Sequence, residues 1–177
     1  MLNSKPNGAG NYRQGNFIPI NKDKVIKLND KGGLYYRSSW ELTAMRYFDN
    51  AERVVSWGAE CITIPYQMKK YDSTGMYNLS KHRYYPDFYY ELLMEDGSKR
   101  KILLEVKPIE QTRPPILKES SRLSAKQLKS YQWSINEYNR NMAKWEASIE
   151  YCKNKGIEFK VLTKEVVDQM LKSMING

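Results

Sequence analysis

At 177 residues, the chain is long enough to form one domain with a buried core. Its net charge of +9 favours an anionic partner, because phosphate contacts release counterions from nucleic acid. Acidic membrane surfaces would respond to the same charge, but no apolar run reaches the roughly 20 residues of a spanning helix. The sequence begins without a signal-peptide core, so we expect a cytoplasmic setting and no membrane partner.

Few residue types are available for catalysis. The chain has one histidine and two separated cysteines, which argues against a zinc site and against a Ser-His-Asp triad. Carboxylates and amines must therefore carry any chemistry, and carboxylates suit hard cations such as Mg²⁺.

Two regions precede the first strands. Residues 1–33 are rich in Asn, Gly and Lys and lack a sustained period, which predicts a flexible basic arm before a single domain over 34–177. Ser38 followed by Glu41 is typical of a capping box, so the first helix should begin at Ser38 or Ser39. Apolar residues then recur at helical spacing as far as Ala51.

Three β-prone segments follow, over 61–66, 83–92 and 101–107, with a turn at Asp96-Gly97. They predict an antiparallel meander, and the stretch from 67 to 82 between the first two segments is predicted to be a polar loop. A proline-rich basic loop then runs from Pro108 to about Arg122.

The clearest periodicity comes next. Apolar residues spaced alternately by three and four predict one long helix that ends near Gly156, and they are Leu128, Tyr131, Ile135, Tyr138, Met142, Trp145, Ile149 and Cys152. A strand over 157–162 and a closing helix over 164–174 complete the chain. We therefore predict an α/β fold with a mixed central β-sheet flanked by helices on both faces.

The pattern that indicates chemistry is Pro86-Asp87 in one predicted strand and Glu105-Val106-Lys107 in the next. Because side chains alternate along a strand, Glu105 and Lys107 share a face while Val106 points the other way. If the strands pair, Asp87 approaches Glu105, and two adjacent carboxylates repel unless a cation lies between them. Mg²⁺ would satisfy both, with the main-chain carbonyl of Val106 and waters completing its ligands.

The alternative interpretation is an exposed cross-strand Glu–Lys pair on a solvated face. The surrounding sequence weighs against it, since Glu105 follows Ile102-Leu103-Leu104 and Asp87 lies among aromatic residues. Charges inside such apolar strands are unfavourable unless they are paired or bound to a metal.

These residues carry a family resemblance. Asp87 with Glu105-Val106-Lys107 resembles the signature of the PD-(D/E)XK nucleases, and the element order is similar to that of their core. More narrowly, the chain resembles the phage head-completion nucleases, in segments that span most of residues 17–165. The segments are 36–41 (YRSSWE), Trp57 with 62–66 (ITIPY), 82–88 (HRYYPDF), 144–147 (KWEA) and 159–163 (FKVLT).

The resemblance implies a restriction-endonuclease-like core and a metal-dependent DNA endonuclease that acts in head completion after packaging. Asp87 and Glu105 would bind Mg²⁺, for which Mn²⁺ could substitute, and Lys107 would be the catalytic lysine. Glu41 would match an acidic residue that supports the metal, although its place in a capping box is a competing structural role. The setting would be the host bacterial cytoplasm during assembly, with retention in the virion and contacts with portal or neck proteins left open.

Basic and amide residues outside the catalytic pattern are candidates for DNA binding. His82 and Arg83 precede Asp87, and Gln127 could point toward the site from the long helix. A basic cluster follows the proline-rich loop, made of Lys118, Arg122, Lys126 and Lys129.

Other functions remain open on the sequence alone. One is a transposon-type or repair-type nuclease of the same superfamily. Others are a non-catalytic DNA-binding structural protein of the head vertex and a basic protein-interaction module. No residue determines the oligomeric state, although a dimer would suit cleavage of two strands.

Overall fold

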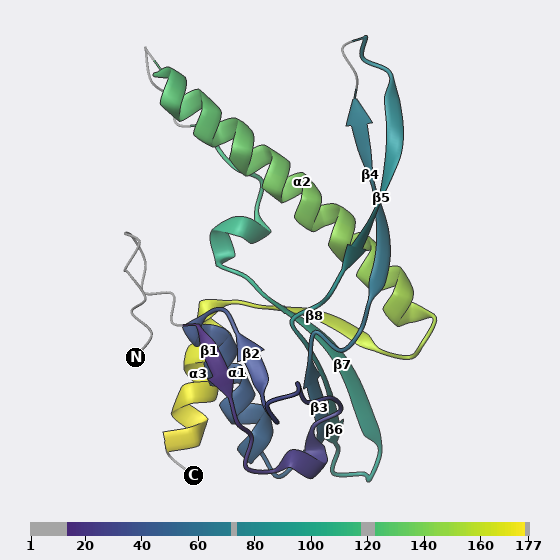
Figure 1. The fold of residues 1–177 in the computed structure, drawn as a ribbon, viewed down its shortest axis with the longest axis vertical. Coiled ribbons are helices and arrows are strands. Elements are labelled where there is room, and N and C mark those ends of the chain that lie inside the picture. The colour runs from purple at the N-terminus through teal and green to yellow at the C-terminus, as the bar shows by residue number, and fades with distance from the viewer. Residues whose placement is uncertain (1–13, 72–73, 118–122, 176–177) are drawn as a thin grey trace.

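A four-stranded mixed sheet forms the centre of the computed structural model, which describes residues 14–71, 74–117 and 123–175. The strand order is β3-β6-β7-β8, where β3, β6 and β7 are antiparallel and β8 runs parallel to β7 (Figure 1). The bounds are Val54–Ala59 for β3, Phe88–Leu93 for β6, Lys99–Val106 for β7 and Glu158–Leu162 for β8.

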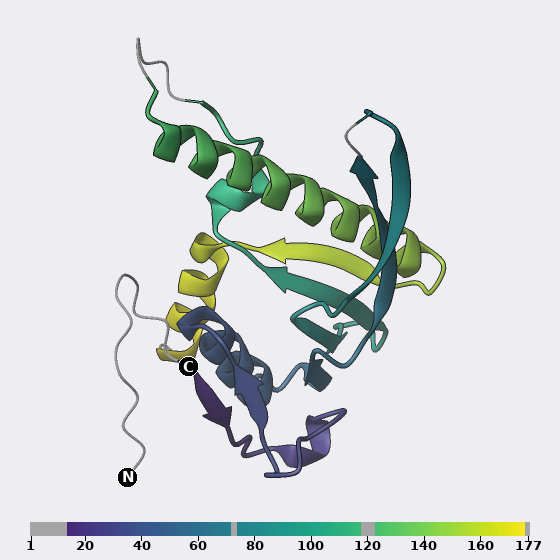
Figure 2. The same cartoon turned by 45° about the horizontal axis from the view of Figure 1, so that its top comes forward.

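Helices cover both faces of this sheet (Figures 1 and 2). On one face, α1 (Ser39–Asn50) and α3 (Lys164–Ile175) pack against Leu104 and Val106 of β7. On the other, α2 (Ala125–Lys153) packs against Leu103. Alternate residues of β7 thus enter two different cores, as strand geometry requires. The predicted α/β fold with a mixed sheet flanked by helices is confirmed.

The first helix begins where the sequence predicts. The Ser38 hydroxyl is its N-cap and accepts a hydrogen bond of 3.1 Å from the Glu41 N–H. The predicted turn between β6 and β7 is also present, with Gly97 at φ +81 in the left-handed region that glycine adopts without strain. None of the helices within the described residues is long and apolar enough to cross a membrane.

The predicted meander is wrong in its first strand. The segment after Cys61 does not join the main sheet, because β3, which the sequence analysis missed, pairs with β6 there. The predicted polar loop over 67–82 is also wrong. Its residues form most of a long hairpin of β4 (Ile64–Tyr71) and β5 (Tyr77–Tyr84), whose base packs against α2.

The predicted strand over 83–92 is divided in two. β5 ends at Tyr84 and β6 begins at Phe88, so the chain leaves the hairpin and enters the main sheet within three residues. Asp87 lies in this connection, immediately before the first paired residue of β6.

The long helix is present, but its predicted stripe is only partly buried. Trp145 and Cys152 are buried, whereas Leu128 is 48% exposed and Ile149 57% exposed. A stripe with period 3.5 drifts around a helix with 3.6 residues per turn, so a straight helix cannot hold all of it on one surface. The N-terminal half of α2 also extends beyond the sheet (Figure 1).

The predicted flexible arm differs from the structure over residues 14–33. Here β1 (Gly15–Phe17) pairs with β2 (Leu34–Tyr36), and a short helix, η1 (Lys22–Lys24), lies between them. The buried Asp49 carboxylate of α1 accepts hydrogen bonds from the N–H groups of Ile20 at 2.8 Å and Asn21 at 3.0 Å. These bonds fix the segment to the domain. Residues 1–13 of the predicted arm lie outside the described residues.

Candidate active site

An open pocket of about 380 Å³ lies where β7 ends, between the base of the hairpin and the start of α1. Glu105, Val106 and Lys107 line it from β7 and the residue after it. The other lining residues come from α1 and the segment before it, the hairpin base, two connections and α2, and they are Arg37, Glu41, Glu60, Arg83, Tyr84, Tyr85, Asp87 and Lys144.

Asp87 is tied to β7 through the main chain. Its Oδ2 accepts a hydrogen bond of 2.7 Å from the Val106 N–H. In the register of the sheet, Phe88 lies opposite Leu104, so Asp87 falls beside the end of β7. The Val106 side chain packs in the core on the other face, as the alternation predicts.

Glu105 is a buried carboxylate with partners on both oxygens. It is 2% exposed, and its Oε1 lies 2.9 Å from the Lys107 Nζ. Its Oε2 accepts a hydrogen bond of 2.5 Å from the Tyr84 hydroxyl. The alternative interpretation of an exposed Glu–Lys pair is therefore wrong, because Glu105 is buried. Its two partners offset the unfavourable burial of its charge.

Burial and neighbouring charges shift the pKa values of three groups in this pocket. Burial, and then the negative charge of Glu105, raise the pKa of Asp87 to about 8. Burial alone would lower the pKa of Lys107, but the charge and hydrogen bond of Glu105 and the charge of Asp87 outweigh it and raise that pKa. Burial and the adjacent Glu105 also raise the pKa of the Tyr84 hydroxyl far above its usual value. The pocket therefore favours an additional positive charge near Asp87.

A divalent cation fits this set of donors. Within the described part of the chain, no three His, Cys, Asp or Glu side chains lie close enough to hold a metal by themselves. Mg²⁺ does not require three, because it commonly keeps several waters and binds through one or two carboxylates. Asp87 and Glu105 supply hard oxygen ligands in one pocket, and a bound cation would favour the ionised form of Asp87 that burial and the charge of Glu105 disfavour.

Glu41 has a structural role at the start of α1, but it differs from the predicted capping box because its carboxylate accepts from Arg37 and not from the Ser38 N–H. Its Oε2 accepts a hydrogen bond of 2.9 Å from the Arg37 N–H, and its Oε1 accepts one of 2.9 Å from the Ser38 hydroxyl. Glu41 nonetheless lines the pocket and contributes to the raised pKa of Asp87. The same carboxylate thus holds the residues just before α1 and adds negative charge to the site.

The residues predicted to bind DNA do not lie together in the structure. Arg83 lines the pocket, whereas the His82 ring stacks on Tyr66, with centroids 5.2 Å apart, and does not line it.

The remaining candidates lie near the start of α2 or before it. Lys126, Gln127 and Lys129 are on its first turns, and Gln127 precedes Lys144 by about 25 Å along the axis at 1.5 Å per residue. The prediction that Gln127 points toward the site is wrong, because its side chain completes a capping box with Ser124. Lys118 and Arg122 lie outside the described residues.

Sequence reasoning missed two residues that contact the site. Tyr84 holds Glu105, and Lys144 lies with its Nζ 5.2 Å from the centroid of the Tyr84 ring, with a pKa lowered by burial. Tyr84 stood beside Pro86-Asp87 in the sequence, which was a usable signal. Lys144 could not be found by periodicity, because it lies between the apolar positions of α2.

An ion pair at the rim of the pocket was also missed. Arg37 pairs with Glu60, whose φ of +47 is in the left-handed region that non-glycine residues seldom adopt. The Glu60 N–H donates a hydrogen bond of 3.1 Å to the Asp87 carbonyl, so the same residue joins the rim to the connection that carries Asp87.

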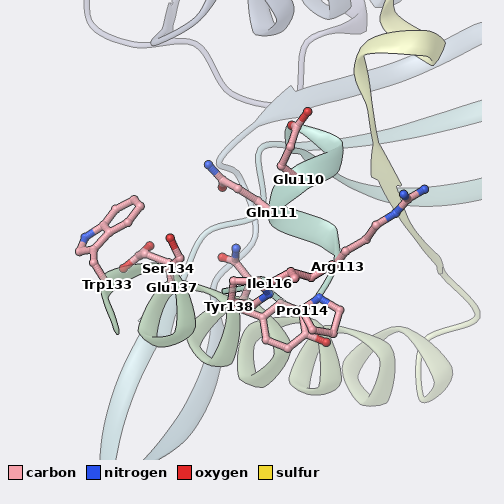
Figure 3. Close-up of a pocket in the computed structure, with 11 residues that line it drawn as sticks. Glu110, Gln111, Arg113, Pro114, Ile116, Trp133, Ser134, Glu137 and Tyr138 are labelled. Carbon is pink, nitrogen blue, oxygen red and sulfur yellow. The ribbon is translucent and has the colours of Figure 1, made fainter. Parts of the chain in front are cut away.

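A second pocket, of about 390 Å³, lies between α2 and the segment formed by η2 (Ile109–Thr112) and the prolines after it (Figure 3). Glu110, Arg113 and Trp133 are among its lining residues. None of the predicted catalytic residues lines this pocket. The predicted catalytic residues instead line the pocket at the end of β7.

Comparison with known proteins identifies the family. Residues 51–164 match the family described as TnsA-like endonuclease N terminal. The chain belongs to the TnsA-like endonuclease family. The TnsA-like match contains Asp87, Glu105, Lys107 and Lys144, whereas Glu41 precedes it. The resemblance to PD-(D/E)XK nucleases is thereby confirmed, and the chain has the fold and nuclease character of an endonuclease domain.

One curated relative matches over nearly its whole length. The head completion nuclease of Enterobacteria phage T4 is 29% identical over 151 residues, which are 85% of this chain and 91% of the relative. This similarity confirms the narrower resemblance predicted from the sequence. No solved structure matches the chain significantly.

Proposed function

We propose that this TnsA-like protein is a divalent-metal-dependent DNA endonuclease whose active site contains Asp87, Glu105 and Lys107. The observation that carries the proposal is their convergence in one pocket, where Asp87 is bonded to Val106 of β7 and Lys107 lies 2.9 Å from Glu105. Three groups with this chemistry, drawn from the end of β7 and from the connection before β6, suit phosphodiester hydrolysis better than structural support.

Nucleases of this superfamily typically use divalent metals, and Mg²⁺, with Mn²⁺ as a substitute, is the proposed cofactor. Asp87, Glu105 and the main-chain carbonyl of Val106 would hold it, with Glu41 adding support through water. When bound, such an ion lowers the pKa of a coordinated water and neutralises charge on the scissile phosphate.

The protein's own groups have distinct tasks in this proposal. Lys107 orients the attacking water and offsets negative charge that develops on the phosphate. The Tyr84 hydroxyl holds Glu105 in one orientation through its 2.5 Å hydrogen bond. The Val106 N–H does the same for Asp87. Arg83 and Lys144 supply positive charge at the pocket, where a phosphate would enter.

The proposed biological role is head completion of a phage after DNA packaging, in the cytoplasm of the host bacterium. Support comes from the phage relative, which matches over almost its entire length rather than over a catalytic motif alone. Contacts with portal or neck proteins and retention in the virion belong to the same proposal, as does a dimer for cleavage of two strands.

The test is cleavage of linear, nicked, branched and single-stranded DNA with Mg²⁺, Mn²⁺ or EDTA. We expect metal-dependent cutting that Lys107→Ala slows by about 10²–10⁴-fold. Lys101→Ala is the matched control, because Lys101 is an exposed residue of β7, the strand that ends just before Lys107.

Two outcomes would contradict the proposal. Equal loss in both lysine variants would exclude a specific role for the pocket. Tight DNA binding by the wild type without any cutting would instead favour a structural protein of the head vertex.

A further inference from the structure

The β4–β5 hairpin extends beyond the main sheet (Figures 1 and 2). Its two faces carry different side chains. In the register, Pro65 lies opposite Arg83, Gln67 opposite Lys81 and Lys69 opposite Leu79. Odd-numbered residues therefore share one face, and even-numbered residues share the other. At the base, the even face packs in the core beneath α2 through Ile64, Tyr66 and Tyr84. The odd face is directed away from that core.

The odd face is exposed and positively charged. All of its described residues outside position 71 are exposed, and they are Pro65, Gln67, Lys69, Tyr77, Leu79, Lys81 and Arg83. Three of these are cations, and the described residues of the hairpin include no Asp or Glu. The Lys69 ammonium lies 4.6 Å from the centroid of the Tyr77 ring, which holds it against this surface. Among the described residues of the hairpin, the face therefore presents positive charge to solvent with no acidic side chain on the same strands.

This charged face is continuous with the candidate active site. Arg83 is on the odd face and also lines the pocket that contains Asp87, Glu105 and Lys107. Lys81 is the next odd-face residue of β5, about 7 Å farther along at roughly 3.4 Å per residue. Lys69, on the neighbouring strand, extends the same row. A chain of phosphates that reaches the pocket past Arg83 would meet Lys81 and Lys69 in succession.

We propose that the odd face of the hairpin binds the sugar-phosphate backbone of duplex DNA beside the scissile bond, through Arg83, Lys81 and Lys69. This inference rests on the proposed function, which makes DNA the substrate. The exposed Leu79 on the same face also suits a protein partner, but the absence of acidic residues from the described hairpin and its continuity with the pocket favour a polyanion. His82, on the even face against Tyr66, has no part in this surface.

The test compares matched charge changes on the two faces. Gln67→Glu places a carboxylate on the odd face, and Asn78→Glu places one on the even face at an exposed position. Both variants lower the net charge by the same amount, so general electrostatic attraction changes equally. Lys81→Ala removes one proposed phosphate contact directly. Binding of a short duplex is measured by fluorescence anisotropy in EDTA, over a range of salt concentrations.

We expect Lys81→Ala to lower the slope of log affinity against log salt by about 0.9, which weakens binding by about 8-fold at 0.1 M salt. Gln67→Glu should weaken binding more than Asn78→Glu, which should remain close to the wild type. Equal effects of Gln67→Glu and Asn78→Glu, or an unchanged slope in Lys81→Ala, would overturn the proposal. Circular dichroism and thermal unfolding confirm that each variant is folded.

Failure of this inference is distinguishable from failure of the proposed function. If the wild type cuts DNA and Lys81→Ala binds with an unchanged slope, the hairpin proposal is wrong and the nuclease stands. If Lys81→Ala lowers the slope but no substrate is cut, the hairpin binds DNA and the catalytic proposal is wrong. Failure of the wild type to bind duplex at low salt would overturn the hairpin proposal outright.

Discussion

The pocket at the end of β7 and the odd face of the hairpin contain lysines in opposite environments. Lys107 is partly buried and lies 2.9 Å from Glu105, whereas Lys81 is exposed on the hairpin. A buried charge requires a specific partner, so each group in the pocket determines the position of its neighbours. An exposed charge acts mainly through water and is screened by salt. Changes in the pocket should therefore be large and specific, and changes on the hairpin small, similar to one another and dependent on salt.

The largest expected effect comes from neutralising the buried carboxylate. Glu105→Gln keeps an oxygen that can accept the Tyr84 hydrogen bond but removes the charge proposed to bind the metal. We expect single-turnover cleavage to fall by about 10³-fold or more, equivalent to roughly 4 kcal/mol. DNA affinity in EDTA should not fall with it. A parallel loss of affinity and cleavage would place Glu105 in substrate binding. It would then contradict the division of roles between the pocket and the odd face of the hairpin.

The next largest effect tests whether a buried carboxylate outside the pocket affects stability without affecting catalysis. Asp49 is a fully buried carboxylate outside the pocket that fixes Ile20 and Asn21. Asp49→Ala leaves two main-chain N–H groups without this acceptor, and we expect the free energy of unfolding to fall by about 2–4 kcal/mol in urea denaturation. Asp49→Asn should cost less, since one oxygen remains. Cleavage per folded molecule should persist; its loss would show that the N-terminal segment takes part in the site.

A smaller effect is expected from the partner of Glu105. Tyr84→Phe removes the hydroxyl that donates to Oε2 and leaves the buried carboxylate with one donor fewer. We expect a stability loss of about 1–3 kcal/mol. A positioning role also predicts slower cleavage with little change in DNA affinity. Unchanged cleavage in a destabilised variant would restrict Tyr84 to a structural role.

Over any single pH unit, the smallest effect is a dependence of stability on pH in the metal-free protein. Folding raises the pKa of Asp87 to about 8, so the folded state binds a proton that the unfolded state releases near pH 4. The stabilisation is complete below pH 4 and is lost as pH rises toward 8. This contribution changes by at most about 1.4 kcal/mol per pH unit. Asp87→Asn should flatten the thermal-unfolding profile in EDTA between pH 5 and 8; a parallel profile would contradict the assignment.

The sequence predicted the parts of the fold that are determined locally. Ser38 with Glu41 predicted the start of α1, and the apolar spacing predicted α2 and the closing strand and helix. Pro86-Asp87 and Glu105-Lys107 predicted the candidate site, because charged residues inside apolar strands are unfavourable without a special partner.

The parts that were missed depend on tertiary contacts. The hairpin has a polar odd face and an even face buried only at its base, so its alternation resembled a polar loop. Residues 14–33 lack a local period, and Asp49, about 28 residues away along the chain, holds them in place. Lys144 reaches the pocket only because α2 crosses the sheet at that point. None of these relations is visible in local sequence spacing.

Asp87 and Glu105 are proposed to bind a divalent metal in this pocket. Mn²⁺ binding followed by electron paramagnetic resonance tests this proposal without depending on a DNA substrate. We expect Mn²⁺ to bind the wild type and Lys107→Ala, and to be lost or greatly weakened in Asp87→Asn and Glu105→Gln. Undiminished binding in both carboxylate variants, or no binding by the wild type, would contradict the assignment of this pocket as the metal-dependent active site.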